Sequence, residues 1–533
     1  MPNPLNASTG WRALAAALLA LGLVGTAVPA LAQTGPSEAE LAAEEAAAAA
    51  EEAARPSAPA AVPALRRVRF GPSAHLDEGI LQAAAAPFIG RPMTQRTLAR
   101  LLAAVNALYA AEGIGLAEAA IDGIEPGGLV RVGLYEARIG AVRSASPLLR
   151  DAQAAWRLGL RPGDPADTRA INDRLLTFSL ADDVLVDAQL AQGAAPGTVD
   201  LVLDLPGLPA RAGLVSLDTY GKRSTGQVRL TLSHRWTSAT GALDPLAVSV
   251  TLTEGGASLA LGYERALSPA GTRLSLSLDA ADTRTLTAPV TRTRALGAEL
   301  GLSHPLVLTE THRLSLIAAL TGFSERGSIA GAPFLHQTGA GLRLGLGGLV
   351  QHEAGFVSGS ATVQATRWRD RFAGTPAQTH RALGVTLAVL QRLGADWAVS
   401  VQGAAQVSGS PAPSRGRFAV AGIGAVRGYD PDAGSGDSGW YLRLQLERAE
   451  ALPLAGGGAA LRPFLFADAG RTYARVPGAG HAAGPALVSA GIGAAFQLSP
   501  AAGGDILLAV PLRSANPTIA GRPVLQAGFA RRF

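Results

Sequence analysis

From residue 213 to the last residue, Phe533, stretches of strictly alternating apolar and polar residues recur along the chain. Between residues 246 and 252, for example, every second residue is Leu or Val, and the residues between them are small or polar. A period of two is typical of β-strands with one apolar and one polar face. We find no convincing helical periodicity in this region, which is therefore predicted to be entirely β.

Sixteen alternating segments follow one another in this region, an even number, as bacterial outer-membrane barrels require. They cover residues 213–220, 226–236, 246–253, 258–266, 272–282, 293–303, 312–323, 338–350, 354–368, 381–393, 396–408, 439–449, 460–474, 485–498, 504–514 and 523–533. A membrane barrel has one face against lipid and one against a wet lumen, so its strands must alternate. An open sheet would leave edge amides unsatisfied in lipid. With an aromatic last residue, the pattern predicts a 16-stranded antiparallel transmembrane barrel over residues 207–533.

Residues 66–205 have a different pattern, in which short strands and amphipathic helices occur twice in the order βααββ. The first copy predicts a strand around Val68, helices at 76–86 and from Thr94 to Gly113, and strands at 117–121 and 129–135. The second copy predicts a strand from Ile139. Its helices are expected at 148–158 and 168–179 and its strands at 184–190 and 199–205. We interpret the two copies as tandem domains, 66–138 and 139–206; a single α+β enzyme domain is the alternative.

The N-terminal 32 residues have the pattern of an export signal. Arg12 precedes an apolar run at 13–24, and Ala30-Leu31-Ala32 offers a small-x-small cleavage site. A membrane anchor is less compatible, because a spanning helix needs about 20 apolar residues. Residues 33–54 are rich in Ala and Glu and are predicted to form an acidic helix without an apolar stripe, followed by a Pro/Ala linker at 55–65.

Composition argues against enzyme chemistry and nucleic-acid binding. The chain has no cysteine, which excludes disulfides, thiol nucleophiles and cysteine-based zinc sites. Its formal net charge of +5 comes from scattered arginines, with Lys222 the only lysine, and lacks the basic clusters of nucleic-acid-binding proteins. Residues 436–439 imitate a serine-protease motif, but no histidine has the context of a catalytic base. We therefore expect no catalytic residue, no metal site, no cofactor and no nucleic-acid partner.

One connection, at about 409–438, is much longer than the others and is therefore expected to be functional. It contains Val426-Arg427-Gly428-Tyr429. The thirteenth segment contains Phe466-Ala467-Asp468-Ala469-Gly470, and its alternation places Phe466 and Asp468 on one face. That face should point into the lumen, because a charge in lipid would cost several kcal/mol.

At this position, the VRGY sequence resembles the tip of the inward-folded loop of two-partner secretion transporters. This TpsB family includes FhaC, ShlB and HecB and is related to BamA-type assembly factors. The resemblance implies that the loop arginine pairs inside the barrel with the aspartate of an F-x-D-x-G strand pattern. The residues of this implied loop lock are Val426, Arg427, Gly428, Tyr429, Phe466, Asp468 and Gly470.

The N-terminal regions extend the resemblance over nearly the whole mature chain. The tandem units resemble POTRA domains, through residues 108–113 and 136–139 among others, and the acidic segment 33–54 resembles the family's plug helix. The implied function is export of one exoprotein, of haemolysin or adhesin type, across the outer membrane. The POTRA-like domains would bind this partner in the periplasm. Outer-membrane lipid, and the barrel assembly machinery during biogenesis, are the other expected partners.

Two other kinds of outer-membrane barrel remain as alternatives. A barrel-assembly factor of the BamA/TamA type usually carries more POTRA modules and lacks a plug helix. A general porin would not need residues 66–205. The sequence thus favours secretion, without naming the exported protein.

Overall fold

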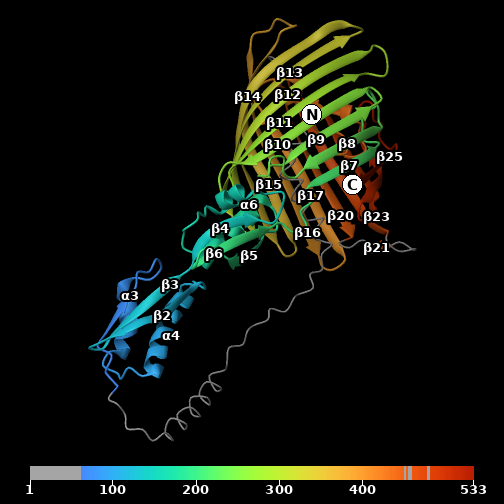
Figure 1. Ribbon diagram of the computed structural model, residues 1–533. Helices are drawn as coiled ribbons and strands as arrows, with labels where there is room; N and C mark the ends of the chain where they lie inside the picture. Colours follow the sequence, from blue (N-terminus) through green and yellow to red (C-terminus); the bar gives the residue numbers. More distant parts are fainter. Residues whose placement is uncertain (1–61, 449–451, 454–458, 477–479) are drawn as a thin grey trace.

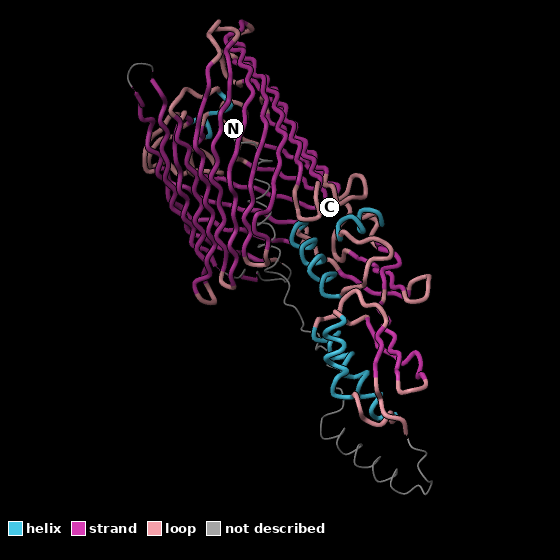
Figure 2. Tube along the Cα trace, turned by 90° about the vertical axis from the view of Figure 1, so that its left-hand side faces the viewer, coloured by secondary structure: helices cyan, strands magenta, loops and turns pink. Residues whose placement is uncertain are grey.

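The computed structural model describes residues 62–448, 452–453, 459–476 and 480–533. The predicted export signal, the acidic segment 33–54 and most of the linker lie outside the described residues. Two small α/β units stand in line and lead into a large barrel (Figure 1). From the side, the longer helices all lie in these two units (Figure 2).

The barrel is a closed sheet of sixteen antiparallel strands, which confirms the predicted fold class. The strands are β7 (Arg211–Asp218), β8 (Arg229–Trp236), β9 (Leu246–Thr253), β10 (Gly256–Ala266), β11 (Arg273–Arg284), β12 (Thr291–Leu308), β13 (His312–Ile329), β14 (Ala332–His352), β15 (Gly355–Asp370), β16 (Gln378–Leu393), β17 (Trp397–Ser408), β20 (Ser438–Arg448), β22 (Ala460–Val476), β23 (Gly480–Ser499), β24 (Ala502–Pro511) and β25 (Val524–Arg532). The two-residue β21 (Leu452–Pro453) continues the pairing of β20 along β22. The last strand pairs with the first, residues 528–532 with 214–218, and so closes the barrel.

The alternation in the sequence corresponds to the two faces of the barrel wall. On β22, Phe464, Phe466 and Asp468 are buried inside, whereas Leu465 and Ala467 between them are exposed on the outside. Leucines and valines cover the outer face of the other strands in the same way. The lumen-facing position expected for Asp468 is therefore what the structure shows.

Three strands extend well beyond their predicted ends. The segments 293–303, 312–323 and 338–350 become the strands β12, β13 and β14. Residues 324–329 of β13 pair with 332–338 of β14 although few of them are apolar. Outside lipid both faces of a hairpin can be wet, so hydrogen bonding continues where the apolar alternation stops.

The first α/β unit has the predicted order βααββ. Its elements are β1 (Arg67–Phe70), α3 (Glu78–Ala85), the 3-10 turn η1 (Ala86–Phe88), α4 (Gln95–Ala111), β2 (Ala117–Glu125) and β3 (Leu129–Glu136), with sheet order β1-β3-β2. Thr94 caps α4, its hydroxyl accepting a hydrogen bond from Thr97 N at 3.1 Å. Helix α4 buries Leu101, Val105 and Tyr109 in the core of the unit.

Glu136, at the end of β3, fastens the first unit internally. Its carboxylate accepts hydrogen bonds from Ser73, from Ala74 N and from the Tyr109 hydroxyl. Burial alone would raise the pKa of Glu136, but these hydrogen bonds outweigh it and lower the pKa. Burial, together with the carboxylate, raises the pKa of Tyr109 to about 12. The Glu136 contribution to stability is thus present above the ordinary glutamate pKa and is lost as the pH falls through the lowered one.

The second unit repeats the order and packs its own core. It comprises β4 (Arg138–Ser144), α5 (Asp151–Leu158), α6 (Thr168–Asp182), β5 (Asp187–Gln192) and β6 (Thr198–Asp204), with sheet order β4-β6-β5. Helix α5 begins at Asp151 rather than at the predicted residue 148. The apolar Leu149 before it bridges instead to Ala242 in the β8–β9 turn of the barrel. The apolar residue Leu149 therefore serves the contact between the second unit and the barrel rather than helix α5.

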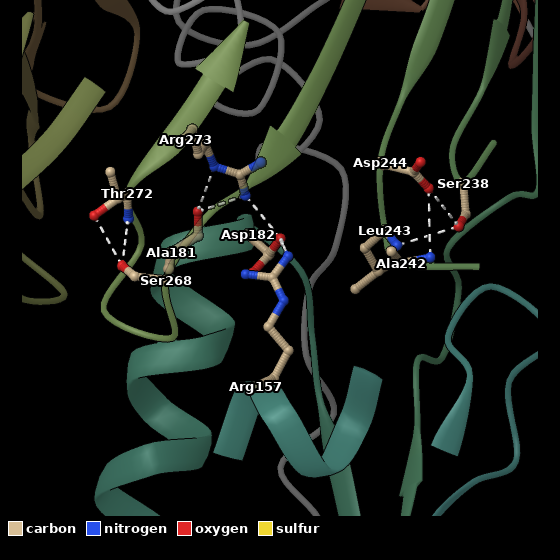
Figure 3. A network of polar contacts seen from close by, with 10 residues as sticks. All are labelled: Arg157, Ala181, Asp182, Ser238, Ala242, Leu243, Asp244, Ser268, Thr272 and Arg273. Atoms are coloured by element: carbon tan, nitrogen blue, oxygen red, sulfur yellow. Dashed lines mark hydrogen bonds and ion pairs between the residues drawn. The ribbon is translucent and has the colours of Figure 1, made fainter. Parts of the chain in front are cut away.

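The second unit rests on one end of the barrel, which we call the near rim; the opposite end is the far rim. The β8–β9 and β10–β11 turns form part of the contact (Figure 3). Arg313, next to the β12–β13 turn, adds a pair with Asp183. Asp182 at the end of α6 receives Arg157 of α5 at 2.8 Å and Arg273 of β11 at 2.7 Å. Arg273 also donates to the backbone oxygen of Ala181 at 2.8 Å. One buried carboxylate therefore links the unit to the barrel.

A second network shapes the β8–β9 turn before it meets the second unit. Asp244 accepts a hydrogen bond from Ser238 at 3.3 Å (Figure 3). It also accepts from Thr240 N at 2.9 Å and from the Tyr263 hydroxyl at 2.9 Å. The turn then offers Gly241 O to Arg150 N at 2.9 Å. The carboxylate of Asp244 thus fixes the conformation of the β8–β9 turn at the near rim.

Replacing Asp182 by Asn should loosen the second unit from the barrel. The side chains of Arg157 and Asp182 are almost fully buried, so the change leaves two guanidinium groups without their counter-charge. Losing one partner of such a buried pair costs about 3–5 kcal/mol. We expect the rate of limited proteolysis in the 205–210 connection of the full-length protein to rise by roughly two to three orders of magnitude.

The adjacent Asp183 provides the matched control. It pairs with Arg313 at 3.3 Å, but its side chain is half exposed. Asp183→Asn should change the free energy of opening the contact, read from the proteolysis rate, by less than about 1 kcal/mol. Exposed pairs contribute little, and Asn tolerates a left-handed backbone. Equal effects of the two substitutions would contradict a specific role for Asp182.

Candidate functional site

The connection between β17 and β20, residues 409–437, folds into the barrel. It contains the short elements η2 (Ser414–Gly416), β18 (Phe418–Ala419), η3 (Pro431–Ala433) and β19 (Ser435–Gly436), and β18 pairs with β19. Residues of this loop contact strands on opposite sides of the lumen. At one side Arg415 donates to Asp279 of β11 at 2.6 Å. At the other, Arg427 reaches β22.

Arg427 and Asp468 form a two-pronged ion pair. Arg427 Nε donates to Asp468 Oδ2 at 2.7 Å, and Nη2 donates to Oδ1 at 2.8 Å. The backbone N–H of Arg427 donates to Oδ2 at 3.0 Å as well. Each residue is only 2% exposed. Paired, charge-assisted bonds of this kind fix orientation as well as distance.

Neighbouring residues complete the environment of the Arg427 guanidinium. Nη1 donates to Gln445 Oε1 of β20 at 2.6 Å. The guanidinium carbon lies 3.8 Å from the centre of the Phe466 ring, a close cation–π contact. All three guanidinium nitrogens thus have partners, which is what a buried charge requires.

Val426 and Tyr429, on either side of the ion pair, anchor the loop by packing. Val426 is fully buried and Tyr429 nearly so, in a cluster with Val420 and Leu487. The Tyr429 hydroxyl lies 2.7 Å from the backbone oxygen of Arg513, and accepts from its N–H. The aromatic ring and its polar tip therefore hold the loop against β23 and the β24–β25 connection.

Two glycines permit the close approach of loop and wall. Gly428 has φ 82°, and a side-chain carbon there would lie 2.7 Å from the Ala509 side chain. Gly470 on β22 lies under Val426, where an added carbon would meet it at 3.0 Å. All seven residues of the implied lock are therefore gathered at one place; their role as a lock stays a prediction.

Other contacts of the loop could not be seen in the sequence. Lys222, in the β7–β8 turn, donates to Asp432 at 2.6 Å, and Asp430 accepts from Arg223 N at 2.9 Å. Gly428 N donates to Gln526 of β25 at 3.1 Å. The only signal in the sequence was the isolated lysine and the nearby Asp430 and Asp432 of the loop. These contacts tie the loop to both strands of the closing seam.

A second, partly buried arginine lies beside the ion pair. Arg443 of β20 is the cross-strand partner of Asp468 and donates to Gln402 at 3.0 Å. Its Nε has no hydrogen-bond partner among the described residues. Two guanidinium groups, those of Arg427 and Arg443, therefore lie near one carboxylate. The negative charge of Asp468 offsets the repulsion between them.

The protease-like residues 436–439 have a structural role. The Ser438 hydroxyl accepts from Ser408 N at 2.9 Å, and the Asp437 carboxylate accepts from Ala412 N and Arg475 N. The described ranges contain no cluster of His, Cys, Asp or Glu placed to hold a metal ion. None of the helices in the described part is both long and apolar enough to cross a bilayer.

Residues 197–496, more than half of the chain, match the haemolysin secretion/activation proteins ShlB/FhaC/HecB. The chain belongs to this family. Membership confirms the resemblance seen in the sequence and makes the protein a TpsB-type outer-membrane secretion transporter. The family match covers β6, the last strand of the second unit, the barrel through most of β23 and the whole inward loop.

Solved structures agree with the family's fold. CdiB from Escherichia coli is similar over 90% of this chain and 93% of its own, with 16% identity and a TM-score of 0.60. CdiB from Acinetobacter baumannii has 15% identity and a TM-score of 0.59 over 92% and 97% of the two chains. BamA from Haemophilus ducreyi lacking POTRA domains 1–3 has 13% identity and a TM-score of 0.52 over 89% and 100%. A search of the curated proteins gives no significant match.

In this ShlB/FhaC/HecB-family protein, Gly428→Ala should displace the inward loop. The methyl group would collide with Ala509 and would also require a left-handed backbone, each costing about 1 kcal/mol or more. We expect a higher single-channel conductance in planar bilayers, because the loop would fill the lumen less completely.

Gly424→Ala is the control for this substitution. Gly424 lies on the same loop, has no atom within 4 Å of an added carbon, and is not in the left-handed region. Its conductance should equal that of the unchanged protein. If Gly428→Ala also left conductance unchanged, the loop would not be positioned by this contact.

Proposed function

We propose that this protein exports one cognate exoprotein, of haemolysin or adhesin type, through its barrel. In this proposal the near rim and both POTRA-like units face the periplasm, and the far rim faces the outside. The single observation that carries the proposal is the loop fastened inside the lumen by the buried pair Arg427–Asp468. A passive pore has no need of such a device, whereas a transporter must hold a movable element in a defined position.

Capture of the substrate would begin at the POTRA-like units. In each three-stranded sheet one side of the outer strands is unpaired. Strand β5 is almost entirely exposed, and Leu185 before it is 70% exposed, with Leu190 on the strand also exposed. An open edge next to apolar side chains can accept an extended segment of another chain through backbone hydrogen bonds. An unfolded exoprotein offers such segments.

The contacts of the loop suggest how export and closure are combined. At its tip, inside the lumen, the loop is held by a buried ion pair, which does not exchange readily with water. Toward the far rim it is held by Lys222 and Asp432, whose side chains are about a third exposed. Exposed pairs are weak and screened by salt. A substrate chain could therefore displace the outer part of the loop while the tip stays fixed.

A barrel-assembly factor remains the second candidate, because the BamA structure shares the fold. Removing the protein from the cell should have different effects under the two functions. Removing a secretion transporter should abolish one extracellular protein. Removing an assembly factor should lower the amounts of many outer-membrane barrels, which proteomics of outer-membrane fractions would detect.

Deleting residues 66–138 should abolish export of the exoprotein while the barrel still assembles. The first unit has its own core and touches the barrel nowhere in the contacts described, so its removal should spare the closed sheet. Export is measured as exoprotein in the culture medium. Heat-dependent gel mobility of the outer-membrane fraction checks the barrel. Normal secretion by the shortened protein would refute substrate capture by this unit.

Arg427→Ala and Asp468→Ala should each impair export with the barrel still inserted. Either change leaves a buried charge without its partner, at a cost of about 3–5 kcal/mol, enough to free the loop. The double variant should be no worse than either single one, since both remove one interaction. Arg427→Lys should restore export only in part, because lysine lacks the fork.

Arg415→Ala serves as the control on the same loop. Arg415 pairs with Asp279, but both side chains are about a quarter exposed, so its loss should cost about 1 kcal/mol or less. Export should stay close to normal. Fully additive defects of Arg427→Ala and Asp468→Ala would show that the two residues act separately and would remove the basis for the lock.

A further inference from the structure

Arginines gather on the outer face of the barrel at the far-rim ends of five of the six neighbouring strands from β11 to β16; only β14 carries none there. These arginines are Arg284, Arg292, Arg294, Arg326, Arg367, Arg369 and Arg381, and all are exposed. Asp282 is the one carboxylate among the outward residues of these described strand ends. This set, called the arginine row below, has no role in the inward loop.

Neighbouring residues that face inward fix the direction of the arginine row. Glu325 points into the lumen, where it accepts a hydrogen bond from Ser414 at 2.6 Å, so the next residue, Arg326, points outward. Trp368 is likewise buried inside the wall, and Arg369 after it is exposed outside. The row therefore faces the surroundings of the barrel rather than its channel.

The height of the row matches a lipid headgroup region. Arg326 is twelve residues beyond Leu314 on the outer face of β13, and Arg369 is twelve beyond Val357 on β15. Twelve residues span about 40 Å along a strand, or about 28 Å across the membrane at the usual tilt of roughly 45°. The apolar band of such barrels is about 25 Å tall. The arginines thus begin where the leucine and valine band ends.

Strand register brings several of these positive charges together. Arg284 is the direct cross-strand partner of Arg292, and Arg294 that of Arg326. Like charges directly opposite one another are destabilising. Asp282 binds Arg292 and Arg294 and offsets part of this repulsion. One carboxylate cannot neutralise the whole row.

Three of the remaining arginines have no counter-charge within the part of the chain that the structure describes. Arg326, Arg369 and Arg381 form no ion pair with any residue in the described ranges. The two strands next to the row differ. Val407 near the far-rim end of β17 and Trp440 near that of β20 are exposed apolar residues, 63% and 41%. The arginine row therefore ends at β16, above the leucines and valines of its own strands.

We propose that the arginine row binds the phosphates of an outer-leaflet glycolipid of the lipid A class. Guanidinium forks match phosphate oxygens, and the leucines and valines below would contact the acyl chains. Six strands at about 4.8 Å spacing make the row about 24 Å wide, which suits a headgroup with two separated phosphates better than one with a single phosphate. The inference uses the orientation proposed above, with the far rim outside, but its test does not depend on export.

The first arm of the test compares lipids on the unchanged full-length protein in detergent. Bisphosphorylated lipid A is added and retention is measured by native mass spectrometry. Lipid A from which both phosphates have been removed should bind at least about tenfold more weakly. Inorganic phosphate at the same concentration should not displace the bound lipid. Equal binding of the two lipids, or displacement by inorganic phosphate, would overturn the proposal.

The second arm compares two triple variants with the same change of charge. Arg326→Gln, Arg369→Gln and Arg381→Gln together remove three unpaired members of the row. The control replaces Arg66, Arg67 and Arg69 by Gln. These three arginines are exposed on the first α/β unit. Heat-dependent gel mobility shows whether each barrel is folded. If a variant fails to fold, the lipid comparison on the unchanged protein still tests the proposal.

The row variant should lose at least about tenfold in lipid A binding, because three charge-assisted contacts are removed. The control should bind like the unchanged protein. If the row variant bound normally, or if the control lost as much, the attraction would be general and the arginine row would not be the site.

Discussion

A single buried ion pair, Arg427 with Asp468, is the interaction on which the arrangement inside this barrel depends. Sixteen strands enclose more space than the side chains of the wall fill. The inward loop can occupy that space only if its polar groups find partners, and the pair supplies three hydrogen bonds at one point. Because both residues are buried, neither can be left alone without a large cost. The pair therefore stays whole or separates as one event.

Much of the fold could be predicted because the membrane imposes it. Lipid outside and water inside force a period of two, so all sixteen segments of the sequence overlap strands of the structure. The rule stops at the membrane surface. There β13 and β14 continue for several residues without apolar alternation, and their ends could not be predicted. Leu149 shows a related limit, since its apolar character serves the contact with the barrel and not a helix.

The candidate site also contains some residues that could be predicted from the sequence and others that could not. The lumen-facing position of Asp468 followed from alternation alone, whereas its pairing with Arg427 was implied only by the family resemblance. The contacts of Gln526 and of the Tyr429 hydroxyl had no signal in the sequence. They join residues about a hundred positions apart, and several use backbone atoms, which every residue possesses. Only the folded chain shows which backbone groups lie within reach.

The contact between Lys222 and Asp432 has a practical consequence, because this lysine is the only one in the chain. Apart from the amino terminus, the protein offers a single amine to acylating reagents. That amine is partly covered by the carboxylate of the inward loop, so its accessibility to a reagent depends on whether the loop is docked. The natural sequence thus carries one chemical reporter at the outer edge of the loop, which can be read without introducing a probe into the barrel.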